Sequence, residues 1–273
     1  MAVKLAYHAN CWGPLGGEAV GVTSAAQLFY RTFGDMRKAA TDIAAAGYSG
    51  IEMFDGNLVD YRGRYGELRA ILADAGLALV AAYSGGNFIF DDILEEELHR
   101  VRLAAEAGAE LGAEHLVVGG GAKRAGGSRP DDLKRLAATL DKVDKIASAA
   151  GLSAHYHPHL TTLVEGPDAV REVFKLTGIR FCPDTAHLAA AGGDPAAMVR
   201  EHRDRITYVH LKGLRKEPFA FTPLDEGDLD NEAVVKELKA IGFSGWITNE
   251  LDAWPDPLDG ARRSHRFLTK ALG

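Results

Sequence analysis

Three short apolar runs, each ending in a side chain that can bind a metal, carry most of the information in this chain: Arg180-Phe-Cys-Pro-Asp184, Ile206-Thr-Tyr-Val-His210 and Trp246-Ile-Thr-Asn-Glu250. Runs of this length and composition predict buried strands. In a parallel α/β protein the strands point the same way, so polar residues at their carboxyl ends converge in space although they are far apart in sequence. Two carboxylates and an imidazole suit a divalent cation. The three runs therefore predict a metal site at the mouth of a parallel barrel.

Apolar runs of strand length alternate with helical patterns along the whole chain. Eight strands are predicted, over residues 3–8, 50–54, 78–83, 115–118, 153–157, 179–182, 206–211 and 245–249. Between them, apolar residues recur every three or four positions over residues 35–46, 95–111, 131–150, 167–176, 195–202 and 231–241, which predicts helices. This alternation, in a chain of 273 residues, predicts a single (β/α)8 TIM barrel over residues 1–273.

Glycines support this phasing. Six of them fall just past a helical run and shortly before a strand, where a left-handed helix cap is wanted: Gly47, Gly76, Gly112, Gly151, Gly178 and Gly242. The longer segments from strand to helix, residues 11–34, 84–91, 119–130 and 213–230, would then all lie on one rim. That rim is where barrel active sites are built.

Composition excludes several classes of protein. The formal charge of −7 argues against nucleic acid or an anionic membrane as a partner. The two cysteines, Cys11 and Cys182, cannot form a disulfide framework or a cysteine zinc cluster, so we expect packing residues in a reduced, cytoplasmic protein. No stretch approaches the roughly 20 apolar residues of a membrane span. The glycines at 119–121 lack the Walker lysine context, so nucleotide binding is not expected.

The fifth predicted strand contributes the densest histidine cluster, Ser153-Ala-His155-Tyr-His157-Pro-His159. His157 occupies the same strand-end station as the three residues above, and neutral imidazole is the commonest metal ligand. For His155 the ordinary interpretation is a polar group bonded within the barrel, and for His159 it is a solvated loop residue. The predicted metal ligands are therefore His157, Asp184, His210 and Glu250.

The other strand-end residues have ordinary interpretations as well. Asp184 could cap a helix that starts near Thr185. His210 could close the core with a satisfied imidazole, and Lys212, on the same side of its strand, could extend to water. A carboxylate such as Glu250, directly after an apolar strand, must be hydrated, paired or bound to a metal. The agreement of several strand ends favours the metal site over these separate explanations.

Further residues on the same rim are candidates for contact with a substrate. Glu52 ends the second predicted strand and could bind a substrate hydroxyl, orient another side chain or form an ion pair in the barrel mouth. His8 and Asn10 share a face at the end of the first strand and could contact a polyol. Trp12 and Phe54 could form an apolar wall, although plain packing explains them as well.

Four segments resemble the sugar phosphate isomerase/epimerase group of xylose-isomerase-like barrels. They are Gly47-Tyr-Ser-Gly-Ile-Glu52, Pro183-Asp-Thr-Ala-His187, Asp204-Arg-Ile-Thr-Tyr-Val-His-Leu-Lys212 and Gly245-Trp-Ile-Thr-Asn-Glu250. The resemblance extends over nearly the whole chain. It implies one divalent metal ion held by four side chains at the ends of strands five to eight, with Mn²⁺ as the first choice and Co²⁺, Mg²⁺ or Zn²⁺ as alternatives.

One position departs from the pattern of this group. The ketose epimerases among its members generally carry glutamate at the strand-five and strand-eight stations, as ligands and as a pair that moves protons. Here Glu250 fits the second station, but His157 stands at the first. The histidine-rich stretch at 155–159 is more similar to inosose dehydratase, which eliminates water from a keto-inositol, and related barrels cleave 3-keto-glycosides by β-elimination. The resemblance implies a ketosugar or keto-polyol substrate.

These enzymes share a first step, the removal of a proton from the carbon next to a ketone. We expect the metal to polarise the carbonyl and stabilise the enediolate, while Glu250, His187 or Glu52 takes the proton. Lys212 or His159 could stabilise an oxyanion or protonate a leaving hydroxide. Return of the proton makes the enzyme an isomerase or epimerase, and loss of a β-hydroxyl makes it a lyase.

The sequence leaves two alternative functions. An endonuclease IV-like phosphodiesterase needs more metal ligands and a positive surface for DNA, which the acidic balance disfavours. A non-catalytic sugar-binding barrel is the other alternative. Exposed aromatic residues such as Trp254 and Phe219 fit either a homo-oligomer contact or ordinary packing at the rim.

Overall fold

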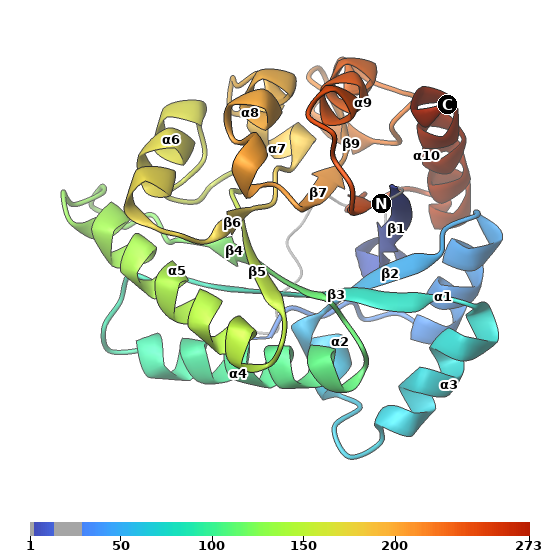
Figure 1. Cartoon of the computed structure of the whole chain (residues 1–273), viewed down its shortest axis with the longest axis horizontal. Helices are drawn as coiled ribbons and strands as arrows, with labels where there is room; N and C mark the ends of the chain where they lie inside the picture. Colours follow the sequence, from blue (N-terminus) through green and yellow to red (C-terminus); the bar gives the residue numbers. More distant parts are fainter. Residues whose placement is uncertain (1–2, 14–28) are drawn as a thin grey trace.

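The computed structural model describes residues 3–13 and 29–273, so residues 14–28 of the predicted rim segment 11–34 lie outside the described residues. Within the described ranges, eight parallel strands form one sheet in the order β6-β5-β4-β3-β2-β1-β10-β7. Parallel bridges from Phe181 to Ile206 and from Asp184 to His210 join β6 to β7 and nearly close the sheet into a barrel. The helices surround these strands (Figure 1). The predicted (β/α)8 barrel is confirmed.

All eight predicted strands are present, with different ends at several of them. The strands are β1 (Lys4–His8), β2 (Gly50–Phe54), β3 (Ala78–Gly86), β4 (His115–Gly120), β5 (Ser153–His157), β6 (Arg180–Phe181), β7 (Tyr208–Leu211) and β10 (Trp246–Asn249). β6 is shorter than predicted, although the Cys182 amide still donates to the Tyr156 carbonyl of β5 at 2.9 Å. β3 and β4 continue further than predicted, into the glycines at their carboxyl ends.

The helices agree with the predicted ranges to within one residue wherever a range was given. They are α1 (Met36–Ala45), α2 (Asp55–Val59), α3 (Tyr65–Ala75), α4 (Leu94–Glu110), α5 (Asp132–Ala149), α6 (Pro167–Leu176), α7 (Thr185–Ala190), α8 (Pro195–Glu201), α9 (Asn231–Ala240) and α10 (Pro257–Leu272). Short 3-10 turns cover Ala9–Trp12 and Arg203–Arg205. A small antiparallel hairpin, β8 (Gly213–Arg215) with β9 (Ala220–Thr222), rises after β7 and was not predicted.

Five of the six predicted cap glycines adopt the expected left-handed backbone, and Gly178 does not. At the end of α6, Thr177 is extended, with φ −131° and ψ 152°. The carboxylate of Asp141 accepts hydrogen bonds from the Thr177 hydroxyl at 2.6 Å and from the Gly178 amide at 3.1 Å. The prediction at Gly178 was wrong because a side chain from α5 terminates this helix instead of a glycine turn.

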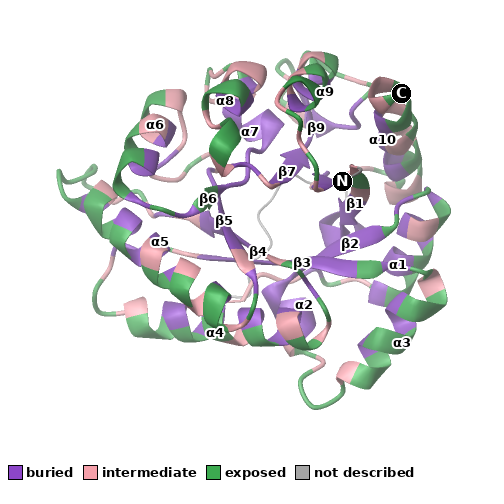
Figure 2. Ribbon diagram, viewed as in Figure 1, coloured by how far each residue is buried: buried purple, intermediate pink, exposed green. Residues whose placement is uncertain are grey.

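Figure 2 shows buried strands and helices whose outer sides are exposed, and the buried apolar residues form two clusters. One cluster fills the inside of the barrel and includes Tyr208, Cys182 and Trp246. The larger cluster lies between strands and helices and includes Val209 and Leu211, so the predicted alternation along β7 is confirmed. Both cysteines are buried and unpaired, as expected of packing residues.

Two remaining predictions concern the surface. Phe219 is 53% exposed, but Trp254 is partly buried, with the Arg263 guanidinium 5.6 Å from its ring, so its predicted exposure was wrong. Among the described residues, no helix is long and apolar enough to cross a membrane.

Candidate metal centre

Four buried side chains meet at the carboxyl ends of neighbouring strands. They are His157 at the end of β5, Asp184 after β6, His210 in β7 and Glu250 after β10. One ligand atom from each lies within 4.8 Å of the ligand atoms of the other three. The structure therefore brings together all four residues predicted as metal ligands, because parallel strands deliver their ends to one mouth.

The hydrogen bonding of this cluster fits a cation. Within the described part of the chain, His157 Nε2, Asp184 Oδ2, His210 Nδ1 and Glu250 Oε2 are buried and make no hydrogen bond of good geometry, although His210 Nδ1 and Glu250 Oε2 face each other at 2.7 Å. Each of the four residues thus leaves at least one polar atom unsatisfied beside the others. Buried polar atoms without partners cost free energy. Two imidazoles and two carboxylates are suitable donors for a borderline divalent ion, which would satisfy all four atoms at once.

The buried acidic and basic groups of the cluster keep one another ionised by electrostatic attraction. Burial alone would raise the pKa of the Glu250 carboxyl, but Lys212 and His210 hold that pKa well below its usual range. Burial alone would likewise lower the pKa of His210, yet Glu52 and Glu250 raise it to about 10. The carboxylates are therefore ionised, as ligands must be, and a cation would replace the imidazole proton.

Asp184 serves both of the roles considered for it. Its Oδ1 accepts a hydrogen bond of 2.9 Å from the backbone amide of His187 and so caps α7. Its Oδ2 lies 3.5 Å from His157 Nε2, among the predicted ligand atoms. The cap fixes the carboxylate so that the second oxygen points into the mouth.

Lys212 does not extend to water, and that alternative was wrong. The side chain is fully buried, and its Nζ lies 3.0 Å from Glu250 Oε1, 3.1 Å from Asp252 Oδ1 and 3.5 Å from Asp184 Oδ2. Burial would lower the pKa of this ammonium, but the three carboxylates raise it. The phenyl ring of Phe221, from β9, covers the ammonium with its centroid at 4.6 Å. Lys212 is therefore a fixed cation beside the predicted ligands.

Asp252 is a member of the site that the residue predictions did not include. It accepts hydrogen bonds from Lys212 Nζ and Asn10 Nδ2, both at 3.1 Å, and its side chain is 27% exposed. Burial raises its pKa to about 6, against the lowering effect of Lys212. The available signal was strand parity, because Asp252 continues the face that carries Thr248 and Glu250.

Two further histidines flank Lys212. The rings of His159 and His187 are 3.7 Å apart, and His187 Nε2 lies 3.3 Å from Lys212 Nζ. Burial lowers the pKa of both imidazoles, that of His159 to about 4. His159 is only partly exposed and its Nδ1 lies 2.7 Å from the Leu160 carbonyl, so it is not a freely solvated loop residue.

The remaining predicted contacts divide between the mouth and the core. Asn10 Nδ2 lies 3.3 Å from Glu250 Oε1, and the Phe54 ring lies 4.5 Å from the His8 ring at the barrel mouth. Trp12 instead packs on the outer core, with its indole N–H donating to Asp42 of α1 at 2.8 Å. The contacts of Trp12 are those of an ordinary packing residue. Its role in an apolar wall around the substrate stays a prediction.

An aromatic residue missed by the sequence reasoning completes the wall of the mouth. Tyr83, near the end of β3, places its ring 5.5 Å from that of His157 and 6.4 Å from that of His210. The Phe54 ring is 5.5 Å away on the other side. Tyr83 and Ala81 share the inward face of β3, so parity could have placed it here.

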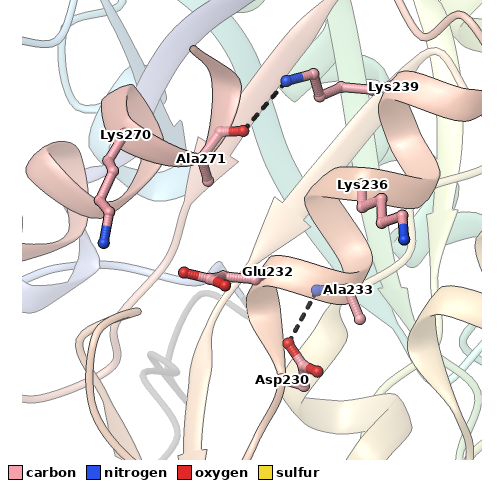
Figure 3. A pocket seen from close by; sticks show the side chains of 7 residues that line it. All are labelled: Asp230, Glu232, Ala233, Lys236, Lys239, Lys270 and Ala271. Carbon is pink, nitrogen blue, oxygen red and sulfur yellow. Dashed lines mark hydrogen bonds between the residues drawn. The ribbon is translucent and has the colours of Figure 1, made fainter.

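A separate surface hollow lies between α9 and α10, away from the strand ends. It is lined by Asp230, Glu232, Ala233, Lys236, Lys239, Lys270 and Ala271 (Figure 3). Lys239 donates to the carbonyls of Ala271 and Leu272, which terminates α10, and Asp230 caps α9 through the Ala233 amide. These contacts are ordinary helix capping. None of the predicted site residues lines this hollow.

With the cluster defined, comparison with known proteins identifies the family. The xylose isomerase-like TIM barrel family matches residues 40–271. The chain belongs to this family. The resemblance seen in the sequence is therefore confirmed, and the match includes all four predicted metal ligands.

Relatives in this family include inosose dehydratases. The enzyme of that name from Lactiplantibacillus plantarum is 29% identical over 158 residues, which cover 49% of this chain and 52% of the relative. The chain thus matches about half the length of that enzyme. An inosose dehydratase from Geobacillus kaustophilus is 27% identical and covers 75% of this chain and 78% of the relative. The rhizopine catabolism protein MocC from Rhizobium meliloti is 24% identical and covers 86% of this chain and 81% of the relative.

Solved structures share the fold along nearly the whole chain. The 3-keto-D-glucoside 4-epimerase from E. coli superposes with a TM-score of 0.72 at 19% identity, covering 98% of this chain and 99% of that one. The D-allulose 3-epimerase from Methylomonas sp. gives a TM-score of 0.77 at 19% identity, with 100% of both chains covered. At these identities the likeness concerns the fold.

Proposed function

We propose that this protein is a divalent-metal-dependent enzyme that removes the proton next to the carbonyl of a ketosugar or keto-polyol. The observation that carries the proposal is the set of four unsatisfied ligand atoms beside a buried lysine. The enzyme names of the relatives support it, since inosose dehydratases and ketose epimerases act on such compounds. Mn²⁺ is the proposed ion, with Co²⁺, Mg²⁺ and Zn²⁺ as alternatives.

His157, Asp184, His210 and Glu250 would hold the ion. When bound, a divalent cation supplies Lewis acidity, which stabilises negative charge developing on a carbonyl oxygen by several kcal/mol. The remaining chemistry falls to the side chains. Asn10 holds Glu250 Oε1 from one side and Lys212 holds it from another, so this carboxylate is fixed in orientation. We propose Glu250 as the base that takes the α-proton.

Elimination is the outcome that the side chains favour. An epimerase that works on both faces of a carbon benefits from two carboxylates, and here His157 replaces one of them. Lys212 is a protonated group beside the cluster, and His187 lies 3.3 Å from it. In the proposed step Glu250 takes the α-proton, the C–C double bond forms, the β-hydroxyl leaves, and Lys212 delivers a proton that converts it to water. Isomerisation or epimerisation is the alternative outcome of the same proton removal.

The proposal is tested by incubating the metal-loaded protein in deuterium oxide with keto-inositols, ketohexoses and 3-keto-glucosides, followed by product analysis. We expect exchange or loss of one α-proton in at least one compound, and a dehydrated product from a keto-inositol. Glu250→Gln should abolish the reaction, whereas Glu165→Gln, which removes a partly exposed carboxylate paired with Lys123, should leave it unchanged. Absence of exchange across the whole panel would overturn the proposed function.

A further inference from the structure

A buried chain of hydrogen bonds lies directly beneath the predicted ligands. The Thr248 hydroxyl donates to the Tyr208 hydroxyl, and Tyr208 donates to Glu52 Oε2. His210 Nε2 lies 3.0 Å from the same carboxylate oxygen. All four side chains are completely buried and come from β2, β7 and β10, so rigid strands fix the geometry.

The direction of each hydrogen bond follows from the chemistry of its acceptor. An ionised carboxylate can only accept, so Glu52 requires the proton of the Tyr208 hydroxyl and a proton on His210 Nε2. With its proton committed to Glu52, Tyr208 accepts from Thr248. When His210 is neutral, its lone pair is then on Nδ1, the atom that lies 2.7 Å from Glu250 Oε2 among the ligand atoms.

The second oxygen of Glu52 faces another imidazole. The backbone amide of Asn10 donates to His8 Nδ1 at 3.0 Å, so a neutral His8 carries its proton on Nε2. That nitrogen faces Glu52 Oε1 at 3.4 Å. Tyr208 and His210 therefore both bond to one oxygen of Glu52, and His8 Nε2 faces the other oxygen without a hydrogen bond. This carboxylate has no exposed surface through which to reach a substrate.

We infer that Glu52, held by Tyr208 and Thr248, is a positioning residue that fixes the tautomer and ring orientation of His210 for metal binding. This assignment rests on the proposed metal site and makes Glu52 a positioning residue instead of a catalytic base. A carboxylate that accepts from the outer N–H of a ligating histidine orients the ring and makes it a better donor. Loss of such a partner weakens metal binding by about 10–100-fold.

Two buried tyrosines provide a matched test. Tyr208 and Tyr156 are both completely buried, and each donates one hydrogen bond, Tyr208 to Glu52 and Tyr156 to the Gly120 carbonyl at 2.9 Å. Tyr156 lies in the outer core, on the opposite face of its strand from the cluster. Tyr208→Phe and Tyr156→Phe each remove one buried hydroxyl, so a purely structural effect would be shared by both.

The experiment titrates metal-free protein with Co²⁺ at fixed pH and follows the visible absorption of the bound ion. We expect Glu52→Gln to weaken the Kd by about 10–100-fold and Tyr208→Phe by about tenfold, the lower end of that range. Tyr156→Phe should bind as the wild type does. In histidine-¹⁵N spectra of the metal-free protein, Glu52→Gln should shift the ring-nitrogen signals of His210 and His8, whose Nε2 atoms both face Glu52, and Tyr156→Phe should leave these signals unchanged.

The outcomes separate this inference from the proposed function. If the wild type binds Co²⁺ and both Glu52→Gln and Tyr208→Phe retain its Kd, the positioning role is overturned while the metal site stands. Equal weakening by Tyr208→Phe and Tyr156→Phe would also overturn it, because the effect would then be general core damage. If the wild type binds no Co²⁺, the metal site itself is overturned.

Discussion

Lys212→Met is expected to destabilise the metal-free protein and to make metal binding more stabilising. In the wild type the buried ammonium lies between 3.0 and 3.5 Å from Glu250, Asp252 and Asp184. Methionine has a similar length and can keep the contact with Phe221, but it leaves these carboxylates without their cation. Removing one partner from a buried ion pair costs about 3–5 kcal/mol, so the free energy of unfolding should fall by that amount.

Metal binding should stabilise the Lys212→Met variant more than it stabilises the wild type. A divalent ion held by the four ligands would repel the Lys212 ammonium, because Lys212 Nζ lies 3.0 Å from Glu250 Oε1 and 3.5 Å from Asp184 Oδ2, on two of the residues that would hold the ion. The variant lacks this repulsion. Neighbouring carboxylates offset part of it, so we expect the stabilisation by saturating metal to exceed that of the wild type by a few kcal/mol.

Urea unfolding with and without saturating Mn²⁺ measures both quantities. Lys38→Met is the matched control, because Lys38 pairs with Asp42 at 2.5 Å but is 66% exposed. Its effect should stay within about 1 kcal/mol and should not depend on metal. The reasoning is refuted if Lys212→Met leaves the metal-free protein as stable as the wild type, or if Mn²⁺ stabilises this variant less than the wild type.

Three further predictions concern stability. Burial lowers the pKa of His115 to about 4, so as pH falls the unfolded chain binds a proton at this residue before the folded chain does. The free energy of unfolding should therefore be highest above pH 6.5 and fall by about 3 kcal/mol towards pH 4. Urea unfolding of His115→Phe should show a correspondingly smaller loss over this range. Burial raises the pKa of Asp55 to about 6, so as pH rises the folded chain keeps the proton on this residue longer than the unfolded chain does. The free energy of unfolding should therefore fall by about 3 kcal/mol as pH rises from 4 to above 6. Asp55→Asn should become more stable relative to the wild type over that range, and an unchanged difference would contradict this prediction. A Cβ at Gly119 would meet the Tyr83 hydroxyl at 2.2 Å, so Gly119→Ala should lower the melting temperature and weaken metal binding, whereas Gly126→Ala, with open space around it, should change neither.

The sequence predicts the fold because its signals are local and repeated. Strand-length apolar runs, helical periodicity and cap glycines recur around the barrel, and the errors lie where other contacts intervene. Gly178 was expected to be left-handed, but Asp141, a residue 37 positions away, caps that helix end. The hairpin of β8 and β9 was not anticipated, because its short strands pair with each other and not with the barrel.

The candidate site likewise has features that the sequence predicts and features that depend on tertiary contacts. Parallel strands bring their ends together whatever their sequence separation, so the cluster of Asp184, His210 and Glu250 could be predicted from strand phasing. The burial of Lys212 could not, because it depends on three carboxylates from two different strand ends and on a phenyl ring from the hairpin. The acceptor role of Glu52 likewise depends on hydrogen-bond directions that only the assembled barrel defines.

Metal stoichiometry tests the central claim most directly. Protein purified without chelator, loaded with Mn²⁺ and freed of excess ion should contain one ion per chain by elemental analysis. His210→Ala should lose nearly all of it, while His202→Ala, which changes a half-buried histidine packed on Phe174 outside the cluster, should retain it. Equal metal content in the wild type and His210→Ala, or no bound metal in the wild type, would contradict the account.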